Sequence, residues 1–296
     1  MRENGRVTSA LEAPAIRAHA AVPPRLIATD LDGTLLRDDK SVSPRTVAAL
    51  AAAEKAGIEV FFVTGRPARW MEVVSDHLHG HGLAICGNGA AVVDLREGPG
   101  RHRFATVREV GHANARETVR LLREAAPGTL FAVEQTYAFH QEHAYPKLFV
   151  ETPDSYGDAD ELLAPGGITA SLPVLKLLAF HPELAPDAFL ALARAAVGDR
   201  VAVTRSSPSA LLEISGPGVS KASTLALCCE ERGISPAEVV AFGDMPNDVE
   251  MLTWSGQAYA MGNAHPDALR AAGRQTAGNN EDGVAIVIEK ILAGLP

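Results

Sequence analysis

The chain has 296 residues, of which 47% are hydrophobic and 21% charged, a composition typical of a folded protein with one or two domains and unlike a disordered or fibrous chain. Lys and Arg number 27 against 36 Asp and Glu, so the formal net charge is −9 and a broad nucleic-acid-binding surface is not expected. Cys86, Cys228 and Cys229 form neither an even set nor a CxxC pair, so the sequence indicates neither a disulfide framework nor a zinc knuckle, and a cytoplasmic protein fits best.

The N-terminal segment is rich in Ala and Pro. We expect residues 1–24 to form a disordered arm, because Glu12, Arg17 and His19 interrupt the apolar run that a cleaved targeting peptide needs. A targeting peptide is the less favoured alternative. No stretch approaches the ~18 consecutive apolar residues of a membrane span, so no membrane partner is expected.

From residue 25 onward, short apolar runs alternate with helical patterns. This alternation is typical of parallel βαβ units and predicts an α/β fold with a parallel sheet flanked by helices. The first predicted strands are 26–29, 58–63 and 83–86. A helix between the first two begins at Ser43-Pro44 and stops at Gly57.

The end of the chain repeats this pattern. The predicted elements are a strand at 211–214, a helix from 221 to about 232 that Ser220 caps, and a buried strand at 239–242. Because ligands in open α/β sheets bind outside the carboxyl ends of the strands, we expect the polar residues that follow the strands to meet at one edge. These residues are Asp30, Asp32, Thr64 and Asp244.

Between these two blocks the pattern changes and predicts an α+β insertion. Its expected elements are a helix at 111–125, strands at 129–134 and 137–141, a passage rich in Gly, Pro and Asp at 153–167, and a strand, helix and strand within 174–205. The predicted division is a disordered arm at 1–24, a core at 25–93 and 210–296, and an inserted domain at 94–209.

Four carboxylates are expected at the same edge of the sheet, where their charges repel. They belong to Asp30, Asp32, Asp244 and Asp248. Hard oxygen ligands at this density favour Mg²⁺, and Lys221 can add a positive charge. Groups suited to contacting a phosphate come from Thr34, Thr64 and Gly65. The arrangement suggests phosphoryl chemistry, in which one carboxylate attacks phosphorus and a second protonates the leaving alcohol and later activates water.

Each motif alone is a weak signal, since an Asp-x-Asp in a turn is more often an Asx-turn or a calcium-like loop. Together and in this order they resemble the four motifs of the haloacid dehalogenase (HAD) superfamily. The motifs are Asp30-Leu31-Asp32-Gly33-Thr34-Leu35-Leu36, Thr64-Gly65-Arg66, Gly218-Val219-Ser220-Lys221 and Gly243-Asp244-Met245-Pro246-Asn247-Asp248. Similarity to the Cof-like branch of subclass IIB comes from Ala260-Met261-Gly262-Asn263-Ala264 and Asn280-Glu281-Asp282-Gly283-Val284.

The resemblance implies a Rossmann-like core, a Mg²⁺ cofactor and an aspartyl-phosphate intermediate. Asp30 would be the nucleophile and a metal ligand, and Asp32 the general acid/base with its backbone carbonyl on the metal. Asp244 would complete the protein ligands, and Asp248 would act at the metal by orienting water. The residues implied to hold the phosphoryl group are Thr64, Gly65, Asn247 and Lys221.

Further phosphate or substrate contacts are expected from Thr34, Arg66 and Asn88. For Arg66, pairing with a local carboxylate is an equal alternative. The stretch between Thr64 and Lys221 is long enough for a domain, and its α+β pattern resembles the subclass IIB cap, which would close over the substrate. Candidate contacts on this cap, each a weak signal, are Glu134, His140, His143 and Lys176. The alternating His77, His79 and His81 fit a solvated loop better than a metal site.

The leading hypothesis is a Mg²⁺-dependent phosphatase acting on small phosphorylated metabolites, such as sugar phosphates or phosphorylated cofactors. One alternative within the same subclass is a sugar phosphomutase, which needs a bisphosphate activator, or a dedicated sugar-phosphate phosphatase. Another is a non-catalytic protein that binds phosphorylated metabolites. The sequence predicts no oligomeric state.

Overall fold

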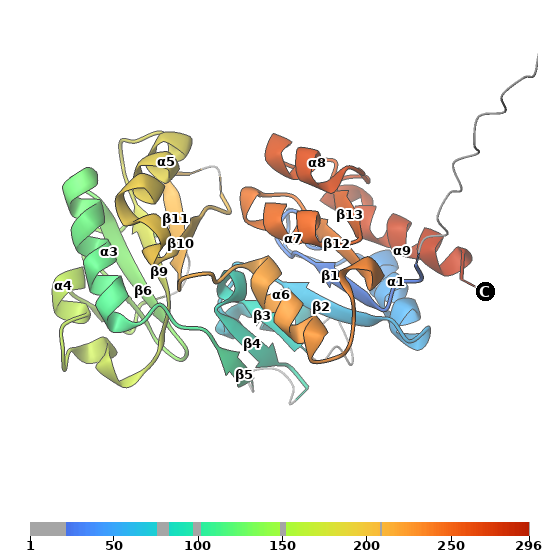
Figure 1. The fold of residues 1–296 in the computed structure, drawn as a ribbon, viewed down its shortest axis with the longest axis horizontal. Helices are drawn as coiled ribbons and strands as arrows, with labels where there is room; N and C mark the ends of the chain where they lie inside the picture. The colour runs from blue at the N-terminus through green and yellow to red at the C-terminus, as the bar shows by residue number, and fades with distance from the viewer. Residues whose placement is uncertain (1–21, 76–82, 97–101, 149–151, 208, 296) are drawn as a thin grey trace, which may run out of the picture.

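The computed structural model describes residues 22–75, 83–96, 102–148, 152–207 and 209–295. The predicted arm, apart from its last residues, and the three alternating histidines His77, His79 and His81 lie outside this part of the chain. Within it, the chain forms two β-sheets side by side, each covered by its own helices (Figure 1).

The first sheet has seven strands in the order β13-β12-β1-β2-β3-β4-β5. The strands are β1 (Leu26–Thr29), β2 (Glu59–Val63), β3 (Leu83–Cys86), β4 (Ala91–Asp94), β5 (Arg103–Val107), β12 (Val239–Gly243) and β13 (Gln257–Ala260). β13, β12, β1, β2 and β3 are parallel, whereas β4 and β5 are antiparallel to their neighbours. Every residue of β1 and β12 is buried. Their continuous apolar runs are typical of parallel strands in a sheet that is covered on both faces.

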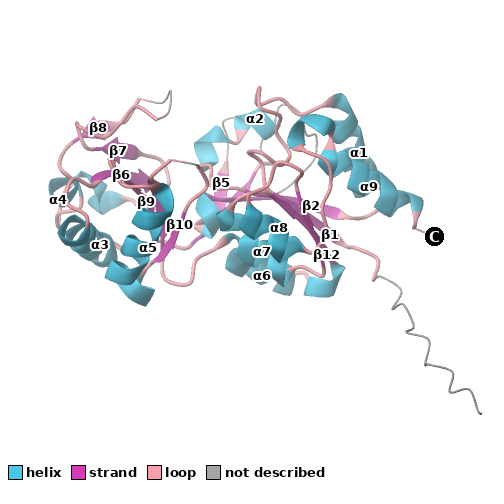
Figure 2. Cartoon of the chain, turned by 90° about the horizontal axis from the view of Figure 1, so that it is seen from above, coloured by secondary structure: helices cyan, strands magenta, loops and turns pink. Residues whose placement is uncertain are grey.

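Helices cover both faces of this sheet (Figure 2). One face packs against α1 (Pro44–Lys55) and α9 (Gly283–Ala293), and the other against α6 (Lys221–Glu230), α7 (Val249–Trp254) and α8 (Pro266–Ala272). The short helix α2 (Glu72–Ser75) precedes β3. The predicted α/β fold class is therefore confirmed.

The second sheet has six strands in the order β10-β11-β9-β6-β7-β8. They are β6 (Leu130–Gln135), β7 (Phe139–Gln141), β8 (Ser155–Tyr156), β9 (Val174–Phe180), β10 (Ala202–Thr204) and β11 (Leu211–Ser215). All neighbours are antiparallel except β7 and β8. α3 (His112–Ala125), α4 (Ala159–Leu162) and α5 (Pro186–Val197) pack on one face around a separate apolar core.

The strand pairing departs from the predicted boundaries of 94 and 209 at both ends. β5 joins the first sheet beside β4, and the prediction of β11 as a core strand is wrong, because Leu212 pairs with Ala179 of β9 in the second sheet. A short apolar run identifies a strand but not its partner, since pairing depends on residues far away in the chain. The second sheet and its helices thus span residues 112–215.

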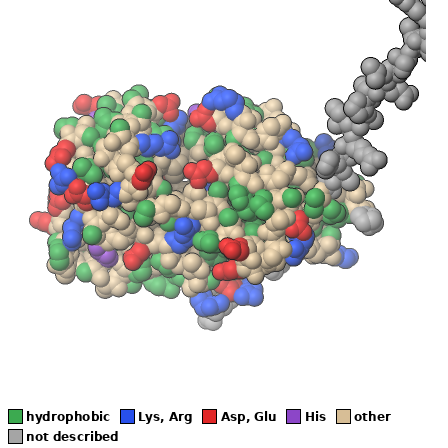
Figure 3. Space-filling view, viewed as in Figure 1, with side chains coloured by type: hydrophobic (Ala, Val, Ile, Leu, Met, Phe, Trp, Pro, Cys, Tyr) green, Lys and Arg blue, Asp and Glu red, His purple; other side chains and the backbone are tan. Residues whose placement is uncertain are grey.

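Acidic and basic side chains are interspersed over the helices of the second sheet, at the left of Figure 3. Arg120 pairs with Glu117 and Glu124 along α3, and Arg123 pairs with Asp158. In the part of the chain that the structure describes, no helix has both the length and the apolar character needed to cross a bilayer.

Candidate active site

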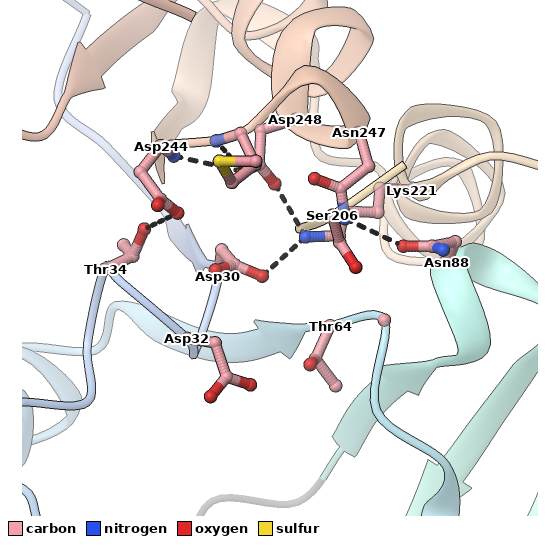
Figure 4. Close-up of polar contacts among 12 residues, drawn as sticks. Asp30, Asp32, Thr34, Thr64, Asn88, Ser206, Lys221, Asp244, Asn247 and Asp248 are labelled. Atoms are coloured by element: carbon pink, nitrogen blue, oxygen red, sulfur yellow. Dashed lines mark hydrogen bonds and ion pairs between the residues drawn. The ribbon is translucent and has the colours of Figure 1, made fainter. Parts of the chain in front are cut away.

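Three neighbouring parallel strands carry polar residues directly at their carboxyl ends. Asp30 follows β1, Asp244 follows β12 and Thr64 follows β2, and the order β12-β1-β2 brings these residues to one edge of the sheet (Figure 4). The backbone N–H of Asp30 donates to the carbonyl oxygen of Phe242 at 3.0 Å, which fixes the end of β1 against β12. The edge therefore gathers residues that are far apart in the sequence.

A buried cluster of charges lies at this edge. Carboxylate oxygens of Asp30, Asp244 and Asp248 lie within 4.8 Å of one another. Lys221 Nζ donates to Asp30 Oδ1 at 2.5 Å and to Asp248 Oδ1 at 2.6 Å. The other oxygen of Asp248 accepts from the backbone N–H groups of Asp244 and Met245, each at 3.0 Å. Lys221 comes from the start of α6, where Ser220 caps the helix as predicted.

The cluster holds more negative than positive charge. Burial raises the pKa of Asp30 well above its ordinary value; Lys221 opposes this rise, and Asp248 and Asp244 add to it. Burial also raises the pKa of Asp244 to about 7, with a further contribution from Asp248. For Lys221, burial acts to lower the pKa, but the carboxylates of Asp248 and Asp30 outweigh burial and keep it raised. One ammonium group thus does not balance three buried acids.

The residues present fit a small divalent cation. Closely spaced carboxylate oxygens are the hard ligands that Mg²⁺ prefers, and its charge would balance the cluster. Asp30 and Asp244 are the best placed to hold it, since both oxygens of Asp248 are already engaged by Lys221 and by backbone N–H groups. Thr34 supports Asp244 by donating from Oγ1 to Oδ1 at 3.0 Å.

Gly33 allows the turn after β1 to approach Asp244. Its φ of +79° lies in the left-handed region, and a Cβ atom there would lie 2.3 Å from Asp244 Oδ2. The carbonyl oxygen of Gly33 also accepts from Asn263 Nδ2 at 2.8 Å. The glycine of the first motif is thus required both by the backbone conformation and by the close approach.

Asp32 lies apart from the buried cluster, and its side chain is 41% exposed. Arg66 donates to both of its oxygens, from Nε at 2.5 Å and from Nη2 at 2.7 Å, and Lys40 Nζ donates to Oδ1 at 2.8 Å. Burial acts to raise the pKa of Asp32, but the hydrogen bonds and charges of Arg66 and Lys40 lower it. Of the two alternatives for Arg66, the structure shows the pairing with a carboxylate.

The remaining predicted phosphate-contacting side chains are held by polar contacts with neighbouring turns. Asn247 Nδ2 donates to Asn88 Oδ1 at 3.0 Å, while Asn247 Oδ1 is buried without a hydrogen-bond partner. Asn88 has a left-handed φ of +57° and donates from Nδ2 to Glu213 Oε2 at 2.9 Å. Thr64 Oγ1 accepts from the backbone N–H of Arg66 at 3.0 Å. Of the predicted residues at this edge, those that line one cavity are Asp30, Asp32, Thr64, Gly65, Arg66 and Asn247.

A cavity of about 450 Å³ lies between this edge and the second sheet. Of the predicted contacts on the inserted domain, Lys176 and Glu134 line the cavity. His140 and His143 do not: His140 contacts Ser155 and Gln135, and His143 stacks on Tyr156.

Sequence reasoning missed several other residues that line the cavity, among them Arg69, Trp70, Ser206 and Glu213. Glu213 carried a signal that could have identified it, because it is a charged residue inside the apolar run of β11.

Comparisons with known proteins agree with the motifs. The family model of haloacid dehalogenase-like hydrolases matches residues 27–288. The 5-amino-6-(5-phospho-D-ribitylamino)uracil phosphatase YitU of Bacillus subtilis is 30% identical over 269 residues, which cover 88% of this chain and 95% of that protein. An HMP-PP phosphatase of Shigella flexneri is 30% identical over 250 residues, which cover 83% and 87% of the two chains.

The fold is also found among solved structures. The solved structure of the HAD subclass IIB sugar phosphatase BT4131 matches this chain with a TM-score of 0.74 and 19% identity. The match covers 90% of this chain and 98% of that one. The predicted class of phosphoric monoester hydrolase is confirmed by the family match and the relatives together. The chain belongs to the haloacid dehalogenase-like hydrolase family, and it has the fold of a subclass IIB phosphatase.

Proposed function

We propose that this hydrolase is a Mg²⁺-dependent phosphatase of small phosphorylated metabolites that works through a phosphoryl group carried on Asp30. The observation that carries the proposal is the contact of Asp30 with Lys221 at 2.5 Å, beside Asp244 and Asp248 at the carboxyl end of β1. Lys221 holds the nucleophilic carboxylate in place and favours its ionised form, against the rise in the pKa of Asp30 that burial causes.

In the first step, an oxygen of Asp30 forms a bond to phosphorus and the bond from phosphorus to the leaving oxygen breaks. Asp32 gives its proton to that oxygen, which leaves as an alcohol. In the second step, Asp32 takes a proton from water, the water oxygen bonds to phosphorus, and Asp30 is released with inorganic phosphate. Asn247, Thr64 and the backbone N–H groups beside Gly65 would hold the oxygens of the phosphoryl group.

Mg²⁺, when bound by Asp30 and Asp244, supplies positive charge that stabilises the phosphoryl oxygens in the transition state. The pair of Asp32 with Arg66 keeps Asp32 ionised, which is the form that the second step needs. The first step needs the protonated form, so Arg66 must release Asp32 when substrate binds. The negative charge of the phosphate gives Arg66 an alternative partner.

The substrate class is supported by the relatives, which are named as phosphatases of a phosphoribitylamino-uracil and of HMP-PP. The second sheet with its helices would act as the cap, because it forms one wall of the cavity at the catalytic edge. The three cysteines are buried free thiols, which suits the predicted cytoplasmic location.

The test is phosphate release from a panel of phosphorylated metabolites with and without Mg²⁺, beside an Asp30→Asn control. Release that needs both Mg²⁺ and Asp30 supports the proposal. Conversion of a sugar monophosphate to its isomer when a sugar bisphosphate is added would favour a mutase instead. Tight binding of esters without release or isomerisation would favour a binding protein.

A further inference from the structure

The two faces of the second sheet have different environments. Side chains alternate along each strand, so β9 directs Leu177 and Ala179 into the core under α3 and α5, and Lys176 and Leu178 to the opposite face. That opposite face forms the wall of the cavity. In the part of the chain that the structure describes, α3, α4 and α5 pack on the first of these faces, whereas the face toward the cavity carries a small apolar cluster that includes Phe139, Tyr145 and Leu178.

This face carries apolar as well as charged residues. Phe139, Leu178 and Leu211 line the cavity and are each less than 10% exposed. The face of an antiparallel sheet that is left to water is usually polar. On the opposite side of the cavity, Trp70 belongs to the segment that follows β2 of the first sheet. The part of the cavity that these four residues line is therefore bounded by apolar and aromatic side chains from both sides.

The charged residues in this part of the cavity are bound to protein groups. Lys176 Nζ donates to Glu213 Oε2 at 2.6 Å and to the carbonyl oxygen of Gly65 at 2.8 Å. Arg69 forms an ion pair with Glu134, whose side chain is 4% exposed. The guanidinium carbon of Arg69 also lies 5.3 Å from the ring centre of Phe139 and 5.8 Å from that of Trp70.

We infer that the part of the cavity lined by Trp70, Phe139, Leu178 and Leu211 binds a planar aromatic or heteroaromatic ring carried by the leaving group of the phosphate ester. This inference rests on the proposed function, which puts the phosphoryl group at Asp30. A polyol in the same place would bury hydroxyl groups against apolar side chains and against charges that already have partners. A flat ring instead covers the apolar wall, and its edge can meet the Arg69–Glu134 pair.

The test compares two primary alkyl esters, so that the leaving oxygens are chemically similar: pyridoxine 5′-phosphate, which has a heteroaromatic ring, and ribitol 5-phosphate, which has a polyol. We expect kcat/KM to be about tenfold or more higher for the ring ester. Trp70→Ala should remove most of this preference through KM, with ribitol 5-phosphate affected about twofold or less. Phe139→Leu keeps an apolar side chain but removes the ring, and it should also reduce the preference for the ring ester.

Leu227→Ala is the matched control, since Leu227 is an apolar residue 45% exposed on α6 and outside the cavity. This variant should leave kcat/KM for both esters unchanged. Equal or better turnover of ribitol 5-phosphate by the unmodified protein would overturn the inference, as would an equal loss for both esters in folded Trp70→Ala and Phe139→Leu. Circular dichroism verifies folding of each variant.

The inference and the proposed function can fail separately. Release of phosphate from ribitol 5-phosphate that depends on Asp30, without a preference for the ring ester, leaves the proposed function standing and removes the ring subsite. Titration calorimetry of both esters into Asp30→Asn protein measures the subsite without turnover. Tighter binding of the ring ester there supports the subsite even if no ester is hydrolysed, and equal affinities contradict it.

Discussion

Lys176 on β9 of the second sheet donates a hydrogen bond of 2.8 Å to the backbone carbonyl oxygen of Gly65, in the turn that follows β2 of the first sheet. The same ammonium group pairs with Glu213, which in turn accepts from Asn88. A buried ion pair of the second sheet thus reaches directly into the turns that surround Asp30.

Lys176→Met should destabilise the protein and weaken substrate binding. The substitution leaves Glu213 buried without its cation, which costs about 3–5 kcal/mol when one partner of a buried pair is removed. We expect the double variant Lys176→Met/Glu213→Leu to recover much of the free energy of unfolding but not the KM, because the link to Gly65 and Asn88 stays broken. Urea denaturation and steady-state kinetics measure the two effects. Full recovery of KM in the double variant would contradict this role.

Lys221→Met should abolish most activity, because Asp30 loses the ammonium group that holds it at 2.5 Å. Loss of one preorganised electrostatic contact at a reacting group lowers kcat by about 10²–10³-fold. The exposed Lys55 at the end of α1 offers a matched Lys→Met control that should stay within about twofold of the unmodified protein. A Lys221→Met variant with near-normal kcat would show that Asp30 does not depend on this lysine.

Removal of metal should make stability depend on pH through Asp244. Its pKa in the folded protein is raised to about 7, against about 3.9 in an unfolded chain. Unfolding therefore releases a proton between these values, and the free energy of unfolding should fall as the pH rises from about 4 to about 7, by up to about 4 kcal/mol. Asp244→Asn should reduce this fall without abolishing it, because burial also raises the pKa of Asp30.

Urea titrations of the metal-free protein at several pH values measure the slope, with Asp244→Asn beside the unmodified protein. Adding Mg²⁺ should restore stability at pH 7 in the unmodified protein and much less in the variant, because a cation favours the ionised carboxylate. Identical slopes for the two proteins would mean that Asp244 does not contribute to this pH dependence.

Gly33→Ala should impair both folding and catalysis, because its Cβ would lie 2.3 Å from Asp244 Oδ2. Gly57→Ala separates this clash from backbone strain, since Gly57 also has a positive φ, +84°, but has no neighbouring atom within 4 Å of its Cβ position. We expect about 1–2 kcal/mol of destabilisation for Gly57→Ala and a larger loss for Gly33→Ala. Equal melting temperatures and normal activity for both variants would show that the turn has room for a side chain.

Much of the catalytic edge follows from local sequence. The apolar runs of β1 and β12 and the acidic residues that follow them were enough to predict that Asp30 and Asp244 meet, because parallel strands align their carboxyl ends. The cap of α6 by Ser220, which presents Lys221 to the acids, was also predictable from a local motif.

What could not be predicted depends on contacts across the chain. The sheet that β11 joins is decided by its register with β9, and the partner of Arg66 by how the turns after β1 and β2 approach each other. Glu213 and Arg69 reach the cavity only because the two sheets face each other. A period-two pattern shows which side chains share a face of a strand, but not what that face meets.

The central claim, that Asp30 carries the phosphoryl group, is tested most directly by rapid acid quench during turnover, followed by peptide mass spectrometry. We expect one phosphoryl group on the peptide that contains Asp30, which accumulates before steady state and is missing in Asp30→Asn. Sustained hydrolysis by Asp30→Asn, or a phosphoryl group on another residue, would contradict it.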